Sequence, residues 1–236
     1  MEKFSLYFIL FLIYSFIGWL IEVVNSLITE KKFVNRGFML GPYCPIYGYS
    51  AIIMILYLEQ YKDNILTVFL LAVVVCSIVE YLVSYIMEKL FNARWWDYST
   101  RKFNINGRVC LMNAFLFGLL GVVLVYFINP LLTGLLSKIN STILIIISLV
   151  WLIIFIGDFI ISMNVTYNIK NTINKLKKDN TEEFNNKINE VLEKKILNRR
   201  IFKAFPKYKI NIISFKEIKN KIEEKIDEFE ERIEKK

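Results

Sequence analysis

The stretch ILTVFLLAVVVCSIVEYLVSYIMEKL, Ile65–Leu90, decides the fold class of this chain. It is almost entirely apolar over 26 residues. A helix of that length is about 39 Å long, and about 20 apolar residues are enough to cross the hydrocarbon core of a bilayer. The stretch therefore predicts a membrane-spanning helix.

Other apolar stretches lie on both sides of this one, and all but the second have roughly the length of a full crossing. They are Phe4–Ile28, Tyr43–Leu58, Val109–Ile128 and Thr142–Met163. The mean hydropathy of the chain, +0.42, is unusual for a soluble domain. We predict an all-α integral membrane protein with about five transmembrane helices in residues 1–163 and a basic, amphipathic helical tail in residues 164–236.

Cationic residues gather in alternate gaps between the apolar stretches. The second and fourth gaps hold one lysine each, whereas the first and third hold Lys31, Lys32, Arg36, Arg94, Arg101, Lys102 and Arg108. Loops rich in lysine and arginine stay on the cytoplasmic side of a membrane. The pattern predicts a multi-pass plasma-membrane protein with its N-terminus outside and its tail in the cytoplasm.

Composition excludes several kinds of chemistry. The chain has no histidine, which removes serine–histidine and cysteine–histidine nucleophile pairs and histidine-based zinc sites. It also has no G-x-x-x-x-G-K-[ST] phosphate loop, and its three cysteines form no C-x-x-C pair. We expect no metal and no cofactor, and a catalytic role is less favoured than a non-catalytic one.

The second apolar stretch has an irregular beginning. Gly41-Pro42 and Pro45 follow Phe38 closely, and proline removes a backbone donor and clashes with the preceding turn of a helix. One interpretation is a broken or re-entrant segment that leads into a short helix from about Ile46. The other is an ordinary interfacial loop whose tyrosines, Tyr43, Tyr47 and Tyr49, join an aromatic belt.

The tail has the pattern of two amphipathic helices separated by Pro206. One apolar face is formed by Phe184, Ile188, Val191, Leu192 and Ile196, and the other by Phe215, Ile218, Ile222, Ile226, Phe229 and Ile233. The net charge of +8 favours contact with anionic lipid. We expect no nucleic acid partner, because acidic residues are interleaved with the lysines of the tail.

Acidic residues inside the apolar stretches are the strongest functional signal. They are Glu22, Glu80, Glu88 and Asp158. An ionised side chain at mid-membrane costs about 2.5–3.5 kcal/mol on insertion scales, so each needs a partner, water or a proton. In the predicted orientation all of them fall in the cytoplasmic half of the membrane, next to the arginines of the inner loops. We expect a polar pocket that opens toward the cytoplasm.

The roles of these residues divide into two groups. The candidates for substrate binding or coupling are Glu22, Arg36, Glu80, Arg94, Asp97, Asn106 and Arg108. Glu88 and Asp158 are expected to be structural or coupling residues, Glu88 because it lies near the interface. Trp95, Trp96 and Tyr98, in the third gap, are of the aromatic type expected at a headgroup boundary.

Several ordered blocks also carry a family resemblance. They are YSFIGWLIEVV (Tyr14–Val24), FVNRGFMLGPYCPIYG (Phe33–Gly48), the stretch Glu80–Leu111 and FGLLGV (Phe117–Val122). Together they resemble the bacterial family of ABC-transporter type IV permeases, over about residues 5–165. The resemblance implies a permease that works with a separate nucleotide-binding subunit.

These observations favour a transport-associated membrane protein, a permease subunit that assembles with an ATP-hydrolysing subunit or as a homo-oligomer. An intramembrane enzyme acting on a lipid or isoprenoid phosphate is an alternative, because arginine, asparagine, glutamate and tyrosine gather at one interface. A non-catalytic scaffold or regulator with a recruiting tail is a further alternative. Membrane lipids are expected partners in every case.

Overall fold

The computed structural model describes residues 1–91, 93–176 and 209–210 of the chain. The two amphipathic helices predicted for the tail lie outside these residues. So does most of the predicted tail domain.

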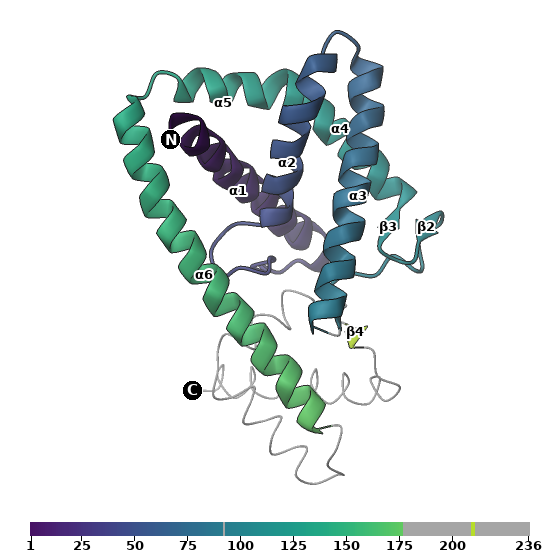
Figure 1. The fold of residues 1–236 in the computed structure, drawn as a ribbon. Helices are drawn as coiled ribbons and strands as arrows, with labels where there is room; N and C mark the ends of the chain where they lie inside the picture. The colour runs from purple at the N-terminus through teal and green to yellow at the C-terminus, as the bar shows by residue number, and fades with distance from the viewer. Residues whose placement is uncertain (92, 177–208, 211–236) are drawn as a thin grey trace.

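Four helices of the described part are long and apolar enough to cross a membrane (Figure 1). They are α1 (Glu2–Glu30), α3 (Ile65–Phe91), the continuous helix Leu111–Leu136 and the Ser141–Asn171 part of α6 (Ser141–Leu176). They correspond to the first, third, fourth and fifth predicted stretches. The chain is therefore an all-α membrane protein.

The second predicted stretch forms a shorter helix, α2 (Pro45–Leu58), which is followed by a 3₁₀ turn, η1 (Glu59–Tyr61). Its 14 residues make about 21 Å of helix, less than the hydrocarbon thickness of about 30 Å. Pro45 occupies the start of the helix, where its missing N–H has no helical partner to lose. The short helix after an irregular segment is as predicted, whereas the re-entrant and interfacial interpretations of that segment both stay predictions.

Helices α1 and α2 pack with their backbones unusually close. A Cβ atom added to Gly48 would lie 2.2 Å from Ser15 Oγ and 2.6 Å from the Phe11 carbonyl oxygen. One added to Gly18 would lie 2.2 Å from Tyr47 Cγ. The glycines therefore let the two helices approach each other face to face.

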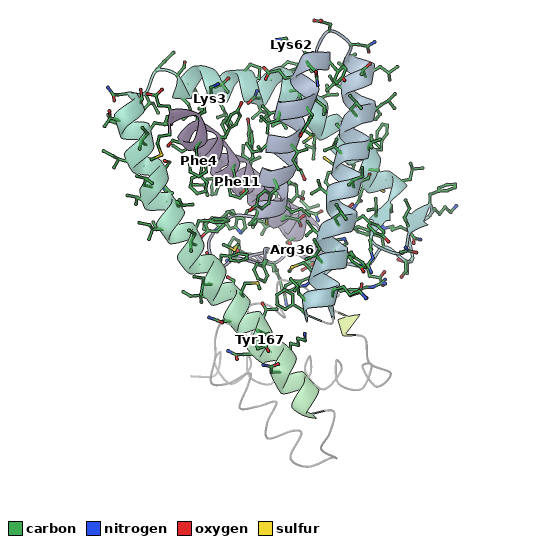
Figure 2. The ribbon with its side chains drawn as sticks, viewed as in Figure 1. Lys3, Phe4, Phe11, Arg36, Lys62 and Tyr167 are labelled. Carbon is green, nitrogen blue, oxygen red and sulfur yellow. The ribbon has the colours of Figure 1, made fainter. Side chains whose placement is uncertain are left out.

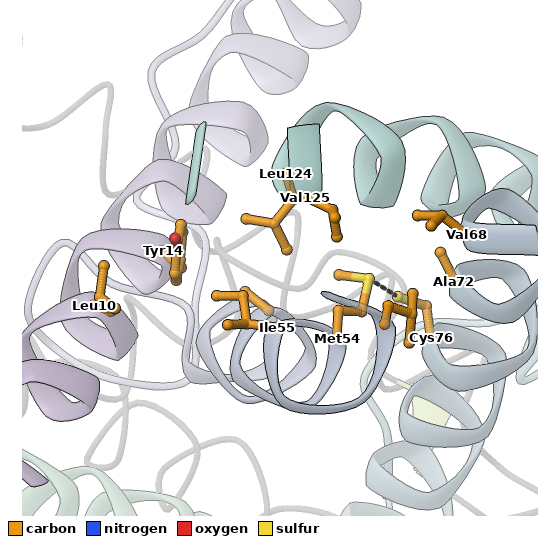
Figure 3. Close-up of a cluster of buried hydrophobic side chains, with 11 residues drawn as sticks. Leu10, Tyr14, Met54, Ile55, Val68, Ala72, Cys76, Leu124 and Val125 are labelled. Atoms are coloured by element: carbon orange, nitrogen blue, oxygen red, sulfur yellow. Dashed lines mark hydrogen bonds between the residues drawn. The ribbon is translucent and has the colours of Figure 1, made fainter. Parts of the chain in front are cut away.

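A buried apolar cluster joins α1, α2 and α3 to the fourth span (Figure 3). The Met54 Sδ and Cys76 Sγ atoms, from α2 and α3, lie 3.7 Å apart in it. The fully or nearly fully buried members are Leu10, Tyr14, Ala51, Met54, Ile55, Leu58, Val68, Ala72, Cys76, Leu124 and Val125. This cluster fixes α2 between α1 and α3.

The fourth span is bent (Figure 1). Helix α4 (Leu111–Val123) passes through a π-helical turn, η2 (Leu124–Ile128), into α5 (Asn129–Leu136). A π-helical turn is a common cause of such kinks. Buried Asn129 accepts a hydrogen bond from the Tyr14 hydroxyl at 3.1 Å, which ties the bend to α1.

Four short strands complete the described part. Strand β1 (Ala93–Arg94) pairs antiparallel with β4 (Lys209–Ile210), so that Ala93 lies opposite Ile210. Strands β2 (Asn104–Ile105) and β3 (Val109–Cys110) form an antiparallel hairpin just before α4.

The cation-rich first and third gaps lie together at one end of the helix bundle. Phe38, from the first gap, contacts the rings of Phe91 and Trp95. Figure 2 shows Lys3 and Lys62 toward the opposite end from Arg36 and Tyr167. We call the end that holds Arg36 the arginine-rich end.

Candidate functional site

Two polar clusters lie at the arginine-rich end. The glutamate cluster comprises Glu22 of α1, Arg36, Tyr47 of α2, Glu80 of α3 and Tyr98. The arginine cluster comprises Glu88 of α3 with Arg94 and Arg108 from the following loop. Glu80, Ser84 and Glu88 follow one another at four-residue spacing on one face of α3, so the two clusters are neighbours along that helix.

Glu80 is the most deeply buried acid of the candidate set, with 5% of its surface exposed. The Tyr98 hydroxyl donates a hydrogen bond to its Oε1 atom at 3.2 Å, and the Asn113 amide also interacts with the carboxyl group. Its Oε2 atom makes no hydrogen bond of normal length to any described residue. Glu80 therefore keeps unused acceptor capacity inside the membrane span.

Glu22 is held from two sides. The Tyr47 hydroxyl donates to its Oε1 atom at 2.7 Å, and Arg36 Nη1 lies 3.9 Å from its Oε2 atom. Arg36 also forms an ion pair with Glu30 at the end of α1. Glu22 interacts electrostatically with Glu80, so both carboxylates belong to one charged region.

Tyr98 lies outside the membrane spans and shows the electrostatic character of this region. Burial, followed by the charge of Glu80, raises the pKa of Tyr98 well above its ordinary value. The hydroxyl therefore stays protonated and acts as a hydrogen-bond donor to the carboxylate.

The arginine cluster is a shared ion pair. Glu88 Oε2 accepts a hydrogen bond from Arg94 Nε at 3.0 Å and forms an ion pair with Arg108 Nη2 at 2.7 Å. Arg108 also donates to Ser84 Oγ at 3.3 Å. The Arg108 guanidinium lies 5.5 Å from the Tyr81 ring centre and 5.4 Å from the Tyr85 ring centre. Two guanidinium groups thus share one carboxylate.

Asn106 and Asp97 shape the loop that carries these arginines. Arg94 Nη1 donates to the Asn106 carbonyl oxygen at 3.1 Å, and the Asn106 amide donates to the Tyr81 hydroxyl at 3.0 Å. The Asp97 carboxylate accepts from the backbone N–H and the hydroxyl of Ser99 at 2.9 and 3.0 Å. These bonds fold the loop back onto α3.

Asp158 of α6 belongs to neither the glutamate cluster nor the arginine cluster. Its carboxylate accepts four hydrogen bonds, from Leu40 N at 2.8 Å, Gly41 N at 2.7 Å, Tyr43 Oη at 2.5 Å and Ser162 Oγ at 2.9 Å. It therefore fixes the irregular segment before α2 to the last span. The candidate residues predicted from the sequence thus divide into the glutamate cluster, the arginine cluster with its loop, and Asp158.

The described residues include no group of three or more histidine, cysteine, aspartate or glutamate side chains that would hold a metal ion. Cys44, Cys76 and Cys110 are buried thiols.

The comparison with protein families fits this arrangement. The family described as "Putative ABC-transporter type IV" matches residues 9–163. This chain belongs to that family. The match covers about two thirds of the chain and contains every candidate residue named above, whereas the tail lies beyond it. The same comparisons found no matching curated protein and no matching solved structure.

Sequence reasoning missed the tyrosines of the site. Tyr98 was expected at a headgroup boundary, but its hydroxyl bonds to buried Glu80. Trp95, expected at the same boundary, is 3% exposed and packs against Phe38. Tyr47 and Tyr43, which the aromatic-belt interpretation placed at the interface, bond to Glu22 and Asp158.

Proposed function

We propose that this protein is the permease subunit of a transport system and that the glutamate cluster binds or couples its substrate. The single observation that carries the proposal is Glu80, a carboxylate inside an apolar span that is bonded to Tyr98 and forms no ion pair with any residue that the structure describes. A buried charge of this kind costs about 2.5–3.5 kcal/mol, and such residues usually line ion and solute paths.

Family membership supports the same proposal, because the matched family is described as an ABC-transporter type. Transport by an ABC-type system requires ATP hydrolysis, and the sequence has no G-x-x-x-x-G-K-[ST] loop. We therefore propose a separate ATP-hydrolysing subunit as partner. The apolar side chains of α6 are largely exposed, which leaves room for that subunit, for a second copy or for lipid.

We also propose that the arginine-rich end faces the cytoplasm of a bacterial cell, with the N-terminus outside. Lys62→Cys and Lys102→Cys place a reactive thiol at opposite ends, against a background of buried native cysteines. A membrane-impermeant maleimide is expected to label Lys62→Cys in intact cells and Lys102→Cys only after permeabilisation. The reverse pattern would overturn the orientation.

Glu80→Gln tests the role of the buried carboxylate. The substitution keeps the size of the side chain and an acceptor for Tyr98, but it removes the charge. We expect flux of the transported solute into membrane vesicles to fall at least tenfold, while expression and thermal stability stay close to those of the wild type. The measurement is a flux screen over small cationic, anionic and zwitterionic solutes.

Glu59→Gln is the matched control, since Glu59 is an exposed acid at the opposite end of the bundle. It should leave flux unchanged. Equal flux of every solute through wild type and Glu80→Gln would contradict the proposed role of Glu80. Purification of the complex from native membranes, followed by an ATP hydrolysis assay, tests the proposed partner separately.

A further inference from the structure

The segment that carries the arginine cluster has more positive than negative side chains. The segment from Tyr85 to Cys110 contains five cations and two carboxylates, a net charge of +3. Both carboxylates have protein partners, because Glu88 bonds to Arg94 and Arg108 and Asp97 bonds to Ser99. The surplus charge is therefore available to an anion from outside the protein.

The cluster lies at the depth of a lipid headgroup. Glu88 is 23 residues after Ile65, the first residue of α3, which places it about 35 Å along the helix. The hydrocarbon core is about 30 Å thick. The Glu88 carboxylate and the arginines bonded to it are thus at the boundary where phosphate groups begin.

Two cations flank one exposed ring at this boundary. Lys89 Nζ lies 5.5 Å from the Tyr85 ring centre, and the Arg108 guanidinium lies 5.4 Å from the same point. The two charges are therefore at most about 11 Å apart, and both lie beside the same ring. Arg94 Nη2 makes no hydrogen bond to a described residue, whereas its Nε and Nη1 atoms hold the loop.

The neighbouring hairpin, β2–β3, adds an independent observation. Phe103 and Ile105 are 79% and 60% exposed, and they lie next to the exposed cations Arg101 and Lys102. In Figure 1 the hairpin projects from the side of the bundle. Apolar side chains flanked by cations are the pattern of a segment that inserts its rings below the phosphates of a charged bilayer surface.

We propose that the arginine cluster, with Lys89 and the β2–β3 hairpin, binds the phosphate of an anionic phospholipid. The phosphate interacts with Lys89 and Arg94 at the rim, and the hairpin lies in the same leaflet. A zwitterionic headgroup is disfavoured because Glu88 and Asp97 are already engaged. The site is separate from the glutamate cluster and does not depend on the transported solute.

The test uses the full chain purified in a non-ionic detergent and titrated with short-chain phosphatidylglycerol, short-chain phosphatidylcholine or inorganic phosphate. We expect saturable binding of phosphatidylglycerol with a rise in melting temperature, and much weaker effects of the other two. Arg94→Gln should raise the Kd for phosphatidylglycerol about tenfold, and Arg94→Lys should restore most of the affinity.

Lys89→Gln is a second variant on an exposed side chain, expected to raise the same Kd about threefold without disturbing the Glu88–Arg108 pair. Lys138→Gln removes one positive charge at the opposite end and should leave the Kd unchanged. Equal binding of phosphatidylcholine, or wild-type affinity in both Arg94→Gln and Lys89→Gln, would overturn the proposal. Equal binding of inorganic phosphate would overturn the lipid as the source of the anion.

Discussion

Gly48→Ala is expected to destabilise the protein by about 1–3 kcal/mol, because it forces α1 and α2 apart. The new Cβ atom would meet Ser15 Oγ at 2.2 Å and the Phe11 carbonyl oxygen at 2.6 Å. The second of these atoms belongs to the backbone, so the clash is relieved only by moving a helix. That movement also displaces Tyr47, which is adjacent to Gly48, from Glu22.

Thermal unfolding in detergent, followed by intrinsic tryptophan fluorescence, measures this effect. Gly134→Ala and Gly157→Ala are matched controls, since a Cβ atom at either position has no neighbour within 4 Å. Both should be neutral or stabilise the helix by up to about 1 kcal/mol, because alanine has a higher helix propensity than glycine. A Gly48→Ala protein that unfolds at the wild-type temperature would show that α1 and α2 tolerate a wider spacing.

Asp158→Ala is expected to cost about 2–4 kcal/mol, since it removes the acceptor of four hydrogen bonds at once. A donor left unsatisfied in a buried site costs about 1–3 kcal/mol, and water will replace part of the loss at this half-buried position. The irregular segment before α2 would lose its attachment to α6. Limited proteolysis should then cut within residues 37–44 faster than in the wild type.

Three further variants test whether the expected loss of stability comes from the Asp158 carboxylate itself. Asp158→Asn keeps one acceptor oxygen but turns an amide donor toward the backbone N–H groups, so its loss should be intermediate. Ser162→Ala removes one hydrogen bond and should cost about 1 kcal/mol. Asp63→Ala, in the exposed turn before α3, should change nothing. Unaltered stability and proteolysis in Asp158→Ala would refute the structural role given to this residue.

The spans were predictable because membrane insertion depends on length and apolarity, which are local properties of the sequence. The start of α2 was predictable for a similar reason, since Pro42 and Pro45 restrict the backbone directly. The existence of buried acids could also be inferred, because Glu80 interrupts an apolar run.

Hydrogen bonds between residues far apart in the sequence were harder to predict. Tyr98 reaches Glu80 only because the loop after α3 folds back. Within that loop Asp97 accepts hydrogen bonds from Ser99, and Asn106 donates one to Tyr81 of α3. Asp158 bonds to backbone N–H groups of Leu40 and Gly41, which carry no side-chain signal at all. The sequence therefore indicated which acids lie inside apolar spans, but it could not indicate the partner that each of them bonds to.

The irregular segment before α2 has a consequence for biogenesis. Its amide groups at Leu40 and Gly41 bond to a residue that is made 118 and 117 positions later. Exposed backbone donors are costly in hydrocarbon. The segment that joins α1 to α2 therefore cannot be buried among lipid tails before α6 is present. We expect the nascent chain to keep this segment in contact with water or with the insertion machinery until α6 has left the ribosome.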